Sequence, residues 1–434
     1  MTAITSSAWE RVPVGSLGEF RNGVNFSKED MGGGLGLINV KDIFSDSARI
    51  DFESLDQVDL AGRRGIENYY VRAGDLFFVR SSVKRDGIGL VSMSQKSSNK
   101  VVHCGFVIRF RPTSPNVESL FLTYLLRSPL YRQIVIGLSS GAAIINISQS
   151  SLGEMMVDLP PLSTQRKIAA ILSAYDDLIE NNTRRIAILE EMAQLLYREW
   201  FVHFRFPGHE SVRMVEVYPK QSSGGLGPRV EAVPEGWALK QLGDIAQEVR
   251  RSAKPEEVDP QTPYIGLAHM PKKSIALSDW GTVAETKSTK LIFRRGEILF
   301  GKIRPYFHKV GVAPVDGVCS TDAVVIVSKA PECFALTLAC VSSEEFVEYA
   351  TLTSQGTKMP RANWNVLVEY PVVLPPQPIL SRFNPIVEDI VDQIQNLIFR
   401  NINLRRTRDL LLPRLVSGGV DVSRLGIDTE GVER

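Results

Sequence analysis

The chain has 434 residues, of which 44% are hydrophobic and 23% are charged, and its formal net charge at pH 7 is +1. These values are typical of a globular protein with two or three domains, each able to bury a core. They argue against a simple basic-tail nucleic-acid binder but allow localised basic patches. The chain shows no uncharged apolar run near the roughly 20 residues of a membrane span, and its N-terminus does not resemble a signal peptide.

The cysteines and histidines give no sign of a metal site. The four cysteines lack CxxC pairing and zinc spacing, and the five histidines are scattered without metal-ligand pairs. We therefore expect buried free thiols in a reduced cytoplasm. The four cysteines are Cys104, Cys319, Cys333 and Cys340.

Residues 1–160 form the first predicted globular unit, in which short strands and helices are mixed. The glycine-rich stretch 32–36 fits no nucleotide-binding fingerprint and is predicted to be a flexible loop. A helix is predicted from Ser119 to Ile136, broken at Pro129 because proline removes a helix hydrogen bond.

A long amphipathic helix is predicted over residues 161–206. It begins at Pro161, where the missing N–H of proline is not needed, and no Pro or Gly follows until Pro207. About forty residues at about 1.5 Å each give a rod of roughly 60 Å. The apolar residues that predict one buried stripe are Ile168, Ile171, Leu172, Tyr175, Leu178, Ile179, Ile186, Leu189, Ala193, Leu196 and Trp200.

The pattern then repeats. A Gly/Ser/Pro-rich linker is predicted at 207–233, a second globular unit at 234–374, a second long helix at 375–416 and a tail at 417–434. The pair Pro375-Pro376 follows Pro160-Pro161 by 215 residues, and apolar positions in both helices step by seven, the heptad spacing of coiled coils. The predicted fold class is α+β: two similar mixed α/β units and two long helices forming an antiparallel coiled coil, an internal repeat with pseudo-two-fold symmetry.

Each predicted unit carries a basic segment at the equivalent place. The seven cations of the first are Arg80, Lys84, Arg85, Lys96, Lys100, Arg109 and Arg111, against one acid, Asp86. The seven of the second are Lys287, Lys290, Arg294, Arg295, Lys302, Arg304 and Lys309, against one acid, Glu297. Lys and Arg neutralise phosphates, and Arg can also bind guanine in the major groove. The repetition favours DNA contact over a merely solvated surface.

Candidate DNA-binding residues come from these segments and from one loop in each unit at matching positions of the repeat. In the first unit they are Arg80, Lys84, Arg85, Ser139 and Ser140. In the second they are Lys302, Arg304, Tyr306, His308, Lys309, Gln355, Lys358 and Arg361.

No convincing catalytic site is found in the sequence. Asp279, Glu285 and Lys287 imitate the carboxylates and lysine of a metal-dependent nuclease, so a self-contained nuclease stays open as an alternative. A second alternative is a scaffold that dimerises through its long helices and does not bind DNA. No residue is predicted to be catalytic, to bind a cofactor or to ligate a metal.

The chain resembles the specificity subunit of a Type I restriction-modification system over essentially its whole length. The features that carry the resemblance are the segment from Leu159 to Ile168 that enters the first long helix, the strand and turn from Gly296 to Tyr306, the second Pro-Pro helix and the duplication. The resemblance implies two target-recognition domains, each binding one half of a bipartite double-stranded DNA site. The long helices would then set the spacing between the half-sites.

The same resemblance implies the partners. Two modification (methyltransferase) subunits would bring S-adenosylmethionine and adenine methylation, and an optional restriction subunit would bring ATP- and Mg-dependent translocation and cleavage. This chain would bind no cofactor itself and would work in the cytoplasm of a prokaryotic cell, at the nucleoid. The helix face around Tyr197, Trp200 and Phe201 is predicted to bind a modification subunit.

Overall fold

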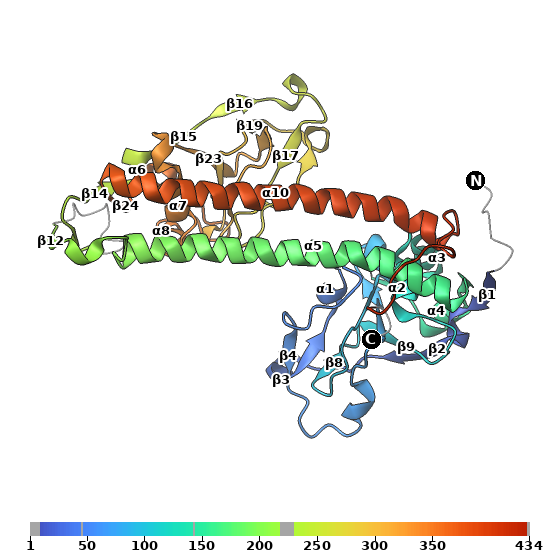
Figure 1. Ribbon diagram of the computed structural model, residues 1–434. Coiled ribbons are helices and arrows are strands. Elements are labelled where there is room, and N and C mark those ends of the chain that lie inside the picture. Colours follow the sequence, from blue (N-terminus) through green and yellow to red (C-terminus); the bar gives the residue numbers. More distant parts are fainter. Residues whose placement is uncertain (1–8, 45–46, 142–143, 218–229, 432–434) are drawn as a thin grey trace. The chain divides into compact units, whose positions relative to one another are not determined.

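The computed structural model describes residues 9–44, 47–141, 144–217 and 230–431. The chain divides into two compact units (Figure 1). Unit 1 consists of residues 1–179 and 404–434, and unit 2 of residues 180–403. Each long helix therefore contributes one part to each unit. The predicted linker lies partly outside the described residues, at 218–229.

Unit 1 is built on a four-stranded antiparallel sheet in the order β2-β9-β5-β7. Its strand β5 is the apolar run Leu-Phe-Phe-Val, buried along its whole length, and it follows a turn in which Gly74 has a φ of 83°. A smaller sheet has the order β4-β3-β8, and two further pairs are β1-β11 and β6-β10. The strands are β1 Glu10–Pro13, β2 Gly18–Asn22, β3 Met31–Ile38, β4 Asp56–Val58, β5 Leu76–Val79, β6 Ser81–Ser82, β7 Val91–Met93, β8 Val101–His103, β9 Val107–Pro112, β10 Ile145–Asn146 and β11 Met156–Leu159.

Helices cover the four-stranded sheet of unit 1 and share its hydrophobic core. Glu118 caps one of them by accepting a hydrogen bond from the backbone N–H of Leu120 at 2.9 Å, and Pro129 occupies the first position of the next. The predicted break at Pro129 is thus confirmed. The helices of unit 1 are α1 Val40–Ile43, α2 Ser119–Arg127, α3 Pro129–Leu138 and α4 Gln149–Glu154.

Unit 2 repeats the strand order of the four-stranded sheet, and its second sheet has five strands where that of unit 1 has three. Its four-stranded sheet has the order β15-β23-β20-β21, and its five-stranded sheet has the order β16-β19-β22-β17-β18. The strands are β12 Met214–Glu216, β13 Ala232–Pro234, β14 Ala238–Gln241, β15 Ala246–Glu248, β16 Arg251–Ala253, β17 Pro263–Ile265, β18 Gly281–Thr282, β19 Lys290–Phe293, β20 Ile298–Gly301, β21 Val310–Val312, β22 Gly317–Cys319, β23 Ala323–Ser328 and β24 Pro371–Leu374. The short helices are α6 Leu242–Ile245, α7 Phe334–Val341, α8 Glu344–Leu352 and α9 Trp364–Leu367.

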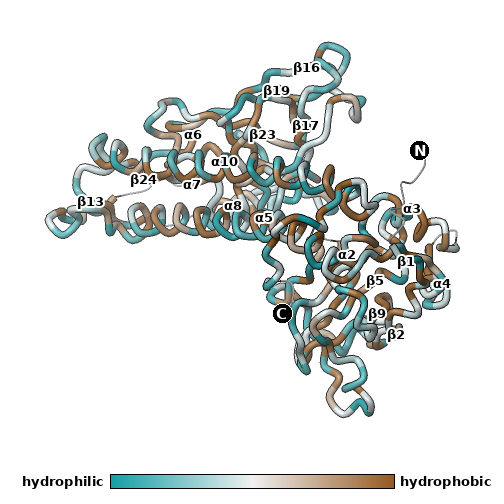
Figure 2. The backbone as a smooth tube through the Cα atoms, turned by 45° about the vertical axis from the view of Figure 1, so that its right-hand side comes forward, coloured by the Kyte–Doolittle hydropathy of each residue, from teal (hydrophilic) through white to brown (hydrophobic). Residues whose placement is uncertain are grey.

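The two long helices are α5, Leu162–Tyr197, and α10, Gln377–Val416. Figure 2 shows hydrophobic positions recurring between hydrophilic ones along both. Gln165 ties the start of α5 to unit 1, because its buried amide donates to the Asn116 and Pro160 carbonyls and accepts from the Glu118 N–H, all at 2.8–2.9 Å.

Within each unit the two helices pack antiparallel. In unit 1 the Asp176 carboxylate accepts hydrogen bonds from Arg408 and from the Tyr124 hydroxyl, both at 2.6 Å. In unit 2 the buried amides of Asn182 and Asn401 join at 2.9 Å, next to a cluster of Ile and Leu side chains. A buried amide pair in such a seam fixes the register of the helices, because any shift would leave polar groups unsatisfied.

Three details differ from the sequence prediction. The glycine-rich stretch 32–36 lies in strand β3, where a bulge between Met31 and Leu35 absorbs the extra residues; glycines tolerate such bulges. Leu178 is 53% exposed and lies outside the buried stripe, whose polar members include Asp176 and Asn182. The α-helix α5 ends at Tyr197 and continues as a π-helical turn, Arg198–Val202.

All four cysteines are buried free thiols, as predicted. Burial raises their pKa, for Cys104 to about 11, so they stay protonated and unreactive near neutral pH. In the part of the chain that the structure describes, no helix combines the length and the apolar character that crossing a membrane requires.

Candidate nucleic-acid interface

In unit 1 the basic segment begins where the central strand β5 ends. The backbone N–H of Arg80 donates to the carbonyl of Phe106 at 2.8 Å, and the Arg80 carbonyl accepts from Ile147 at 3.0 Å. Beyond it β6 pairs with β10, and Asn146 of β10 exchanges two backbone hydrogen bonds with Ser140, at 3.0 and 2.7 Å. These backbone bonds bring two distant loops of the sequence to one edge of the unit.

Unit 2 forms the same ladder from different residues. Lys302 follows β20; its N–H donates to Asp322 and its carbonyl accepts from Ala362, both at 2.9 Å. Gln355 and Arg361 exchange backbone hydrogen bonds at 3.0 and 2.9 Å. Lys302 therefore corresponds to Arg80, Gln355 to Ser140 and Arg361 to Asn146. We call this shared ladder the backbone frame.

The backbone frame gathers most of the predicted DNA-binding residues of unit 2. Arg304 donates its backbone N–H to Pro360 at 2.7 Å and its guanidinium to the Lys358 carbonyl at 3.3 Å. Arg361 lies 3.5 Å from the Asp322 carboxylate and is exposed. Two segments more than fifty residues apart thus present their cations on one surface.

In unit 1 the frame borders a pocket of about 450 Å³. Arg80 lines it, with one guanidinium nitrogen donating to the Gly105 carbonyl at 3.2 Å. Ser139 lies beside it, and its hydroxyl donates to Ile136 at 2.7 Å. Apart from Ser140, the sequence did not single out the rest of the lining, because serine and asparagine side chains carry no periodic or charge signal. The other polar lining residues are Asn22, Ser140, Asn146, Ser148, Gln149, Ser150 and Ser151.

Lys84 and Arg85 are exposed on the turn that follows β6. The hydroxyl of Ser82 accepts from the Lys84 N–H at 3.1 Å and donates to its carbonyl at 2.7 Å, which fixes the start of this turn. Both cations remain available to a ligand. The loop residues 142–143 lie outside the described residues.

The turn 302–309 of unit 2 is held in an unusual conformation. Arg304 and His308 both have a φ of 50°, in the left-handed region that side chains other than glycine rarely adopt. The Tyr306 side chain between them is 51% exposed. His308 points inward instead, with Nε2 at 2.9 Å from the Ser342 carbonyl, and burial lowers its pKa. Of these residues, Tyr306 can contact a ligand, whereas the side chain of His308 stabilises the turn.

Lys309 closes the same turn by donating its ammonium to the carbonyl of Leu267. Burial, and then the charge of Lys272, lower the pKa of Lys309. Lys272 itself lies over the ring of Phe307 at 4.7 Å, a cation–π contact that fixes the ring under the turn. Lys272 and Lys309 therefore place their positive charges close together beside this turn.

The predicted partner surface requires a correction. Trp200 and Phe201 are only 6% and 5% exposed, and their rings pack on Phe383 at 5.6 and 4.7 Å. Tyr197 stacks on Phe201 at 5.6 Å, and burial raises its pKa well above the ordinary value. The π-helical turn directs both Trp200 and Phe201 into the core of unit 2. Trp200 and Phe201 are thus core residues, and Tyr197 is a partly buried residue packed against that core, so the three do not form an open surface.

Helix α5 does have an exposed apolar stripe, formed by residues other than these three. Ile188, Met192 and Leu195 follow at i, i+4 and i+7 and are 49%, 52% and 46% exposed. This spacing gives a continuous ridge on one side of a helix. The sequence prediction missed it because two interleaved apolar faces on one helix cannot be separated by periodicity alone.

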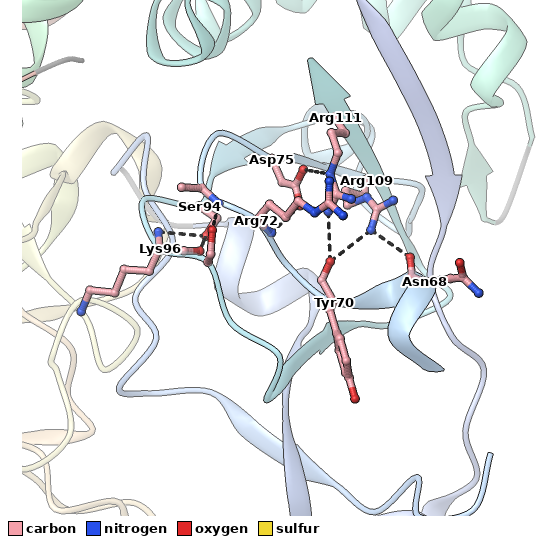
Figure 3. A network of polar contacts seen from close by, with 10 residues as sticks. Asn68, Tyr70, Arg72, Asp75, Ser94, Lys96, Arg109 and Arg111 are labelled. Atoms are coloured by element: carbon pink, nitrogen blue, oxygen red, sulfur yellow. Dashed lines mark hydrogen bonds and ion pairs between the residues drawn. The ribbon is translucent and has the colours of Figure 1, made fainter. Parts of the chain in front are cut away.

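Next to the start of strand β5, at the end opposite Arg80, unit 1 has a buried polar network (Figure 3). Arg111 makes two hydrogen bonds of 2.7 Å to the carboxylate of Asp75 and one of 3.0 Å to the Tyr70 carbonyl. Arg109 donates to the carbonyls of Asn68 and Tyr70 at 3.1 and 3.3 Å. Burial lowers the pKa of Arg109 to about 10, which still leaves it charged at neutral pH. The network anchors the segment 68–75 to strand β9.

The residues of the nuclease alternative do not form a recognisable site. Asp279 and Lys287 are exposed, and the side chain of Glu285 lies outside the described residues. In the described ranges no group of three or more His, Cys, Asp or Glu side chains could hold a metal ion.

Known proteins are similar to this chain in sequence and architecture. The family model "Type I restriction modification DNA specificity domain" matches residues 6–191. The specificity subunit of the type I restriction enzyme MjaIX from Methanocaldococcus jannaschii is 26% identical over 446 residues, covering 96% of this chain and 94% of that one. The EcoDI specificity subunit from Escherichia coli is 25% identical, covering 67% of this chain and 68% of that one.

A solved structure agrees on the fold. The S subunit of a type I restriction-modification system from M. genitalium superposes with a TM-score of 0.56 at 15% identity, covering 95% of this chain and 98% of that chain. The chain thus has the two-unit, two-helix architecture of such a subunit. In sequence and in fold it is similar to the specificity subunits of type I restriction-modification systems.

Proposed function

We propose that this chain recognises a bipartite double-stranded DNA target and assembles the modification subunits of a restriction-modification complex on it. The observation that carries the proposal is the backbone frame, which occurs once in each unit and presents exposed or half-exposed cations in both. Two equivalent surfaces on one chain match a target with two half-sites. The family model that matches residues 6–191 supports the same proposal, since it is described as a DNA specificity domain.

The contacts in each unit divide by chemistry. Lys84, Arg85, Lys302 and Lys358 are suited to phosphates, which carry no sequence information but position a protein on the duplex. Arg361 and Tyr306 extend from the frame with donors that can reach base edges. The polar pocket of unit 1 would supply the corresponding groups for its half-site.

The chemistry of modification would reside on the partners. S-adenosylmethionine would bind the modification subunits, and ATP with Mg would bind a restriction subunit where the system has one. The specificity chain would contribute only the recognition of the target sequence. Because its target would be chromosomal DNA, it would act at the nucleoid.

For the modification subunits we propose the exposed stripe Ile188, Met192 and Leu195 as a binding surface in unit 2. Three large apolar side chains on a ridge favour an apolar partner face, because their burial removes exposed hydrocarbon from water. Arg184 and Glu180, an i, i+4 ion pair on the same helix at 3.5 Å, would lie at the polar rim.

A charge in this stripe should prevent assembly. We expect Met192→Asp to weaken association with the modification subunit at least tenfold, or about 1.4 kcal/mol, measured by titration calorimetry. Leu130→Asp is a matched control, since Leu130 is an exposed apolar residue on α3 of unit 1. Equal losses for the two variants, or none for Met192→Asp, would remove the stripe from the proposal.

The function itself is tested by methylome sequencing of a host that carries this chain with its modification subunit. We expect methylated adenines in one bipartite motif with two defined half-sites and a fixed unread spacer. Exchanging residues 9–160 with those of a relative should change one half-site only. A methylation pattern that does not depend on this chain would refute the proposal.

A further inference from the structure

Unit 2 contains a second loop at the candidate interface, residues 266–273, which we call the His269 loop. It packs directly against the basic turn 302–309. The Lys309 ammonium donates to the Leu267 carbonyl, the Lys273 N–H donates to the His308 carbonyl at 2.8 Å, and Lys272 lies over Phe307. The loop therefore belongs to the same surface as the predicted DNA-binding residues, although no sequence pattern singled it out.

This loop holds the side chain of His269 in one tautomer. Its Nδ1 lies 3.0 Å from the backbone nitrogen of Gly266. A backbone N–H can only donate, so Nδ1 is the acceptor and the proton of the neutral ring is on Nε2. The ring of Tyr264 meets the imidazole edge to face at 5.7 Å and 86°, which holds its orientation. The half-buried ring thus presents a pre-oriented N–H donor.

Unit 1 shows that the loop itself does not need this donor. At the equivalent place, after Ile38, the N–H of Asn39 donates to the carboxylate of Asp42 at 2.7 Å, again three residues on. The two loops are equivalent because Cys104 donates to Ile38, and Ser320 to Ile265, at 3.0 and 3.2 Å. An acceptor alone is therefore enough to close the loop. The Nε2–H of His269 has no hydrogen-bond partner among the described residues.

We propose that His269 recognises a guanine in the half-site bound by unit 2, with its Nε2–H as the donor; this inference rests on the proposed DNA recognition. In the major groove guanine presents two adjacent acceptors, O6 and N7, whereas adenine and thymine present one acceptor each and cytosine presents a donor. The neighbouring ammonium groups of Lys272 and Lys309 favour the most electronegative base edge. A rigid, single-proton donor among flexible cations is suited to base recognition, whereas the cations are suited to phosphates.

The test uses His269→Asn in the full chain with its modification subunit, on a randomised library of DNA duplexes. Asn can accept the Gly266 N–H through Oδ1, as the carboxylate of Asp42 does for Asn39 in unit 1, but its amide ends short of the Nε2 position. We expect the preference for guanine at one position of one half-site to fall about tenfold. The other half-site and the dependence of binding on salt should be unchanged.

Lys272→Ala is the matched control on the same loop. It should weaken binding to all sequences alike and flatten the salt dependence by about 0.9, with every base preference kept. If His269→Asn leaves every base preference intact, or weakens all sequences uniformly with a flatter salt dependence, His269 is not a base contact and the inference is wrong. If the wild-type complex selects no motif at all, the proposed function fails instead.

Discussion

The interiors of the two units differ although their strands pair in the same way. Where unit 1 has His103 and Arg109, unit 2 has Cys319 and Val325 at the corresponding positions of the strand pairing. All four residues are at most 4% exposed. The same topology therefore accepts either a polar or an apolar interior.

The polar interior of unit 1 is stable only because its charges are paired. Asp75 neutralises Arg111 and is itself 1% exposed, and the segment 68–75 supplies carbonyls to Arg109. Both ring nitrogens of His103 are buried without a hydrogen-bond partner, which costs free energy. Unit 2 has one ion pair at the equivalent turn, between Arg251 and Glu297, and it is less buried. Unit 1 should thus be the more sensitive to loss of a charge.

The largest expected effect is from Asp75→Asn. It leaves the Arg109 and Arg111 charges buried without their carboxylate and should lower the free energy of unfolding of unit 1 by about 3 kcal/mol. Glu297→Gln, the matched change in unit 2, should cost about 1 kcal/mol because the partners are partly solvated. Hydrogen exchange followed by mass spectrometry on peptides covering 68–112 and 290–328 measures both. Equal losses in the two units would contradict the comparison.

A smaller difference is expected in the response to acid. Burial, and then the charge of Arg109, lower the pKa of His103 from 6.5 to about 3. The unfolded chain binds a proton below pH 6.5 and folded unit 1 does not, so stability falls as the pH decreases from 6.5 towards 3. The loss approaches about 1.4 kcal/mol per pH unit. Hydrogen exchange in unit 1 between pH 6.5 and 5 measures it, after correction for the intrinsic exchange rate.

The control for this pH dependence is His103→Cys, which places the residue of unit 2 at the equivalent position in unit 1. Its overall stability will change, because a thiol is smaller than an imidazole, but its pH slope in this window should fall by the contribution of one histidine. An unchanged slope in the variant would show that His103 is not the group that titrates.

The smallest expected effect is on the salt dependence of DNA binding, compared between the candidate interfaces of the two units. Lys302→Ala should flatten the logarithmic salt dependence of DNA binding by about 0.9 for one lost phosphate contact. Arg80→Ala should do the same and also loosen its loop, because Arg80 donates to the Gly105 carbonyl whereas no side-chain hydrogen bond of Lys302 is found in the described structure. Filter binding from 50 to 300 mM salt distinguishes the two. No change for either variant would remove both residues from the interface.

Much of the fold could be predicted from the sequence, because its strongest signals are long or repeated. The second helix begins at Gln377, two residues from the predicted start, and ends at Val416 as predicted. The predictions were wrong where one residue type serves two purposes. The glycine-rich stretch 32–36 was interpreted as a loop although it lies in a bulged strand, and Trp200 and Phe201 were interpreted as a surface although a π-helical turn directs them inward.

The candidate site was predicted only in part. Charge density located Arg80 and Lys302, and the repeat located Ser140, Gln355 and Arg361. The inward direction of His308 depends on a left-handed backbone at that residue, which no sequence pattern encodes. The His269 loop was missed for a related reason. A backbone N–H three residues away sets the tautomer of the imidazole, and the role of His269 becomes visible only when it is compared with Asp42, the equivalent residue of unit 1.

The backbone frame has a consequence for how such a protein can acquire a new target. Its hydrogen bonds join main-chain atoms only, and at its matched positions the two units have Arg and Lys, Ser and Gln, Asn and Arg, and Ile and Ala. No pair is identical, yet the bonds are kept. Side chains on the frame can therefore be replaced without rebuilding the loops that carry them. Substitutions on this surface can therefore change which DNA sequence is bound while the main-chain hydrogen bonds and the fold are kept.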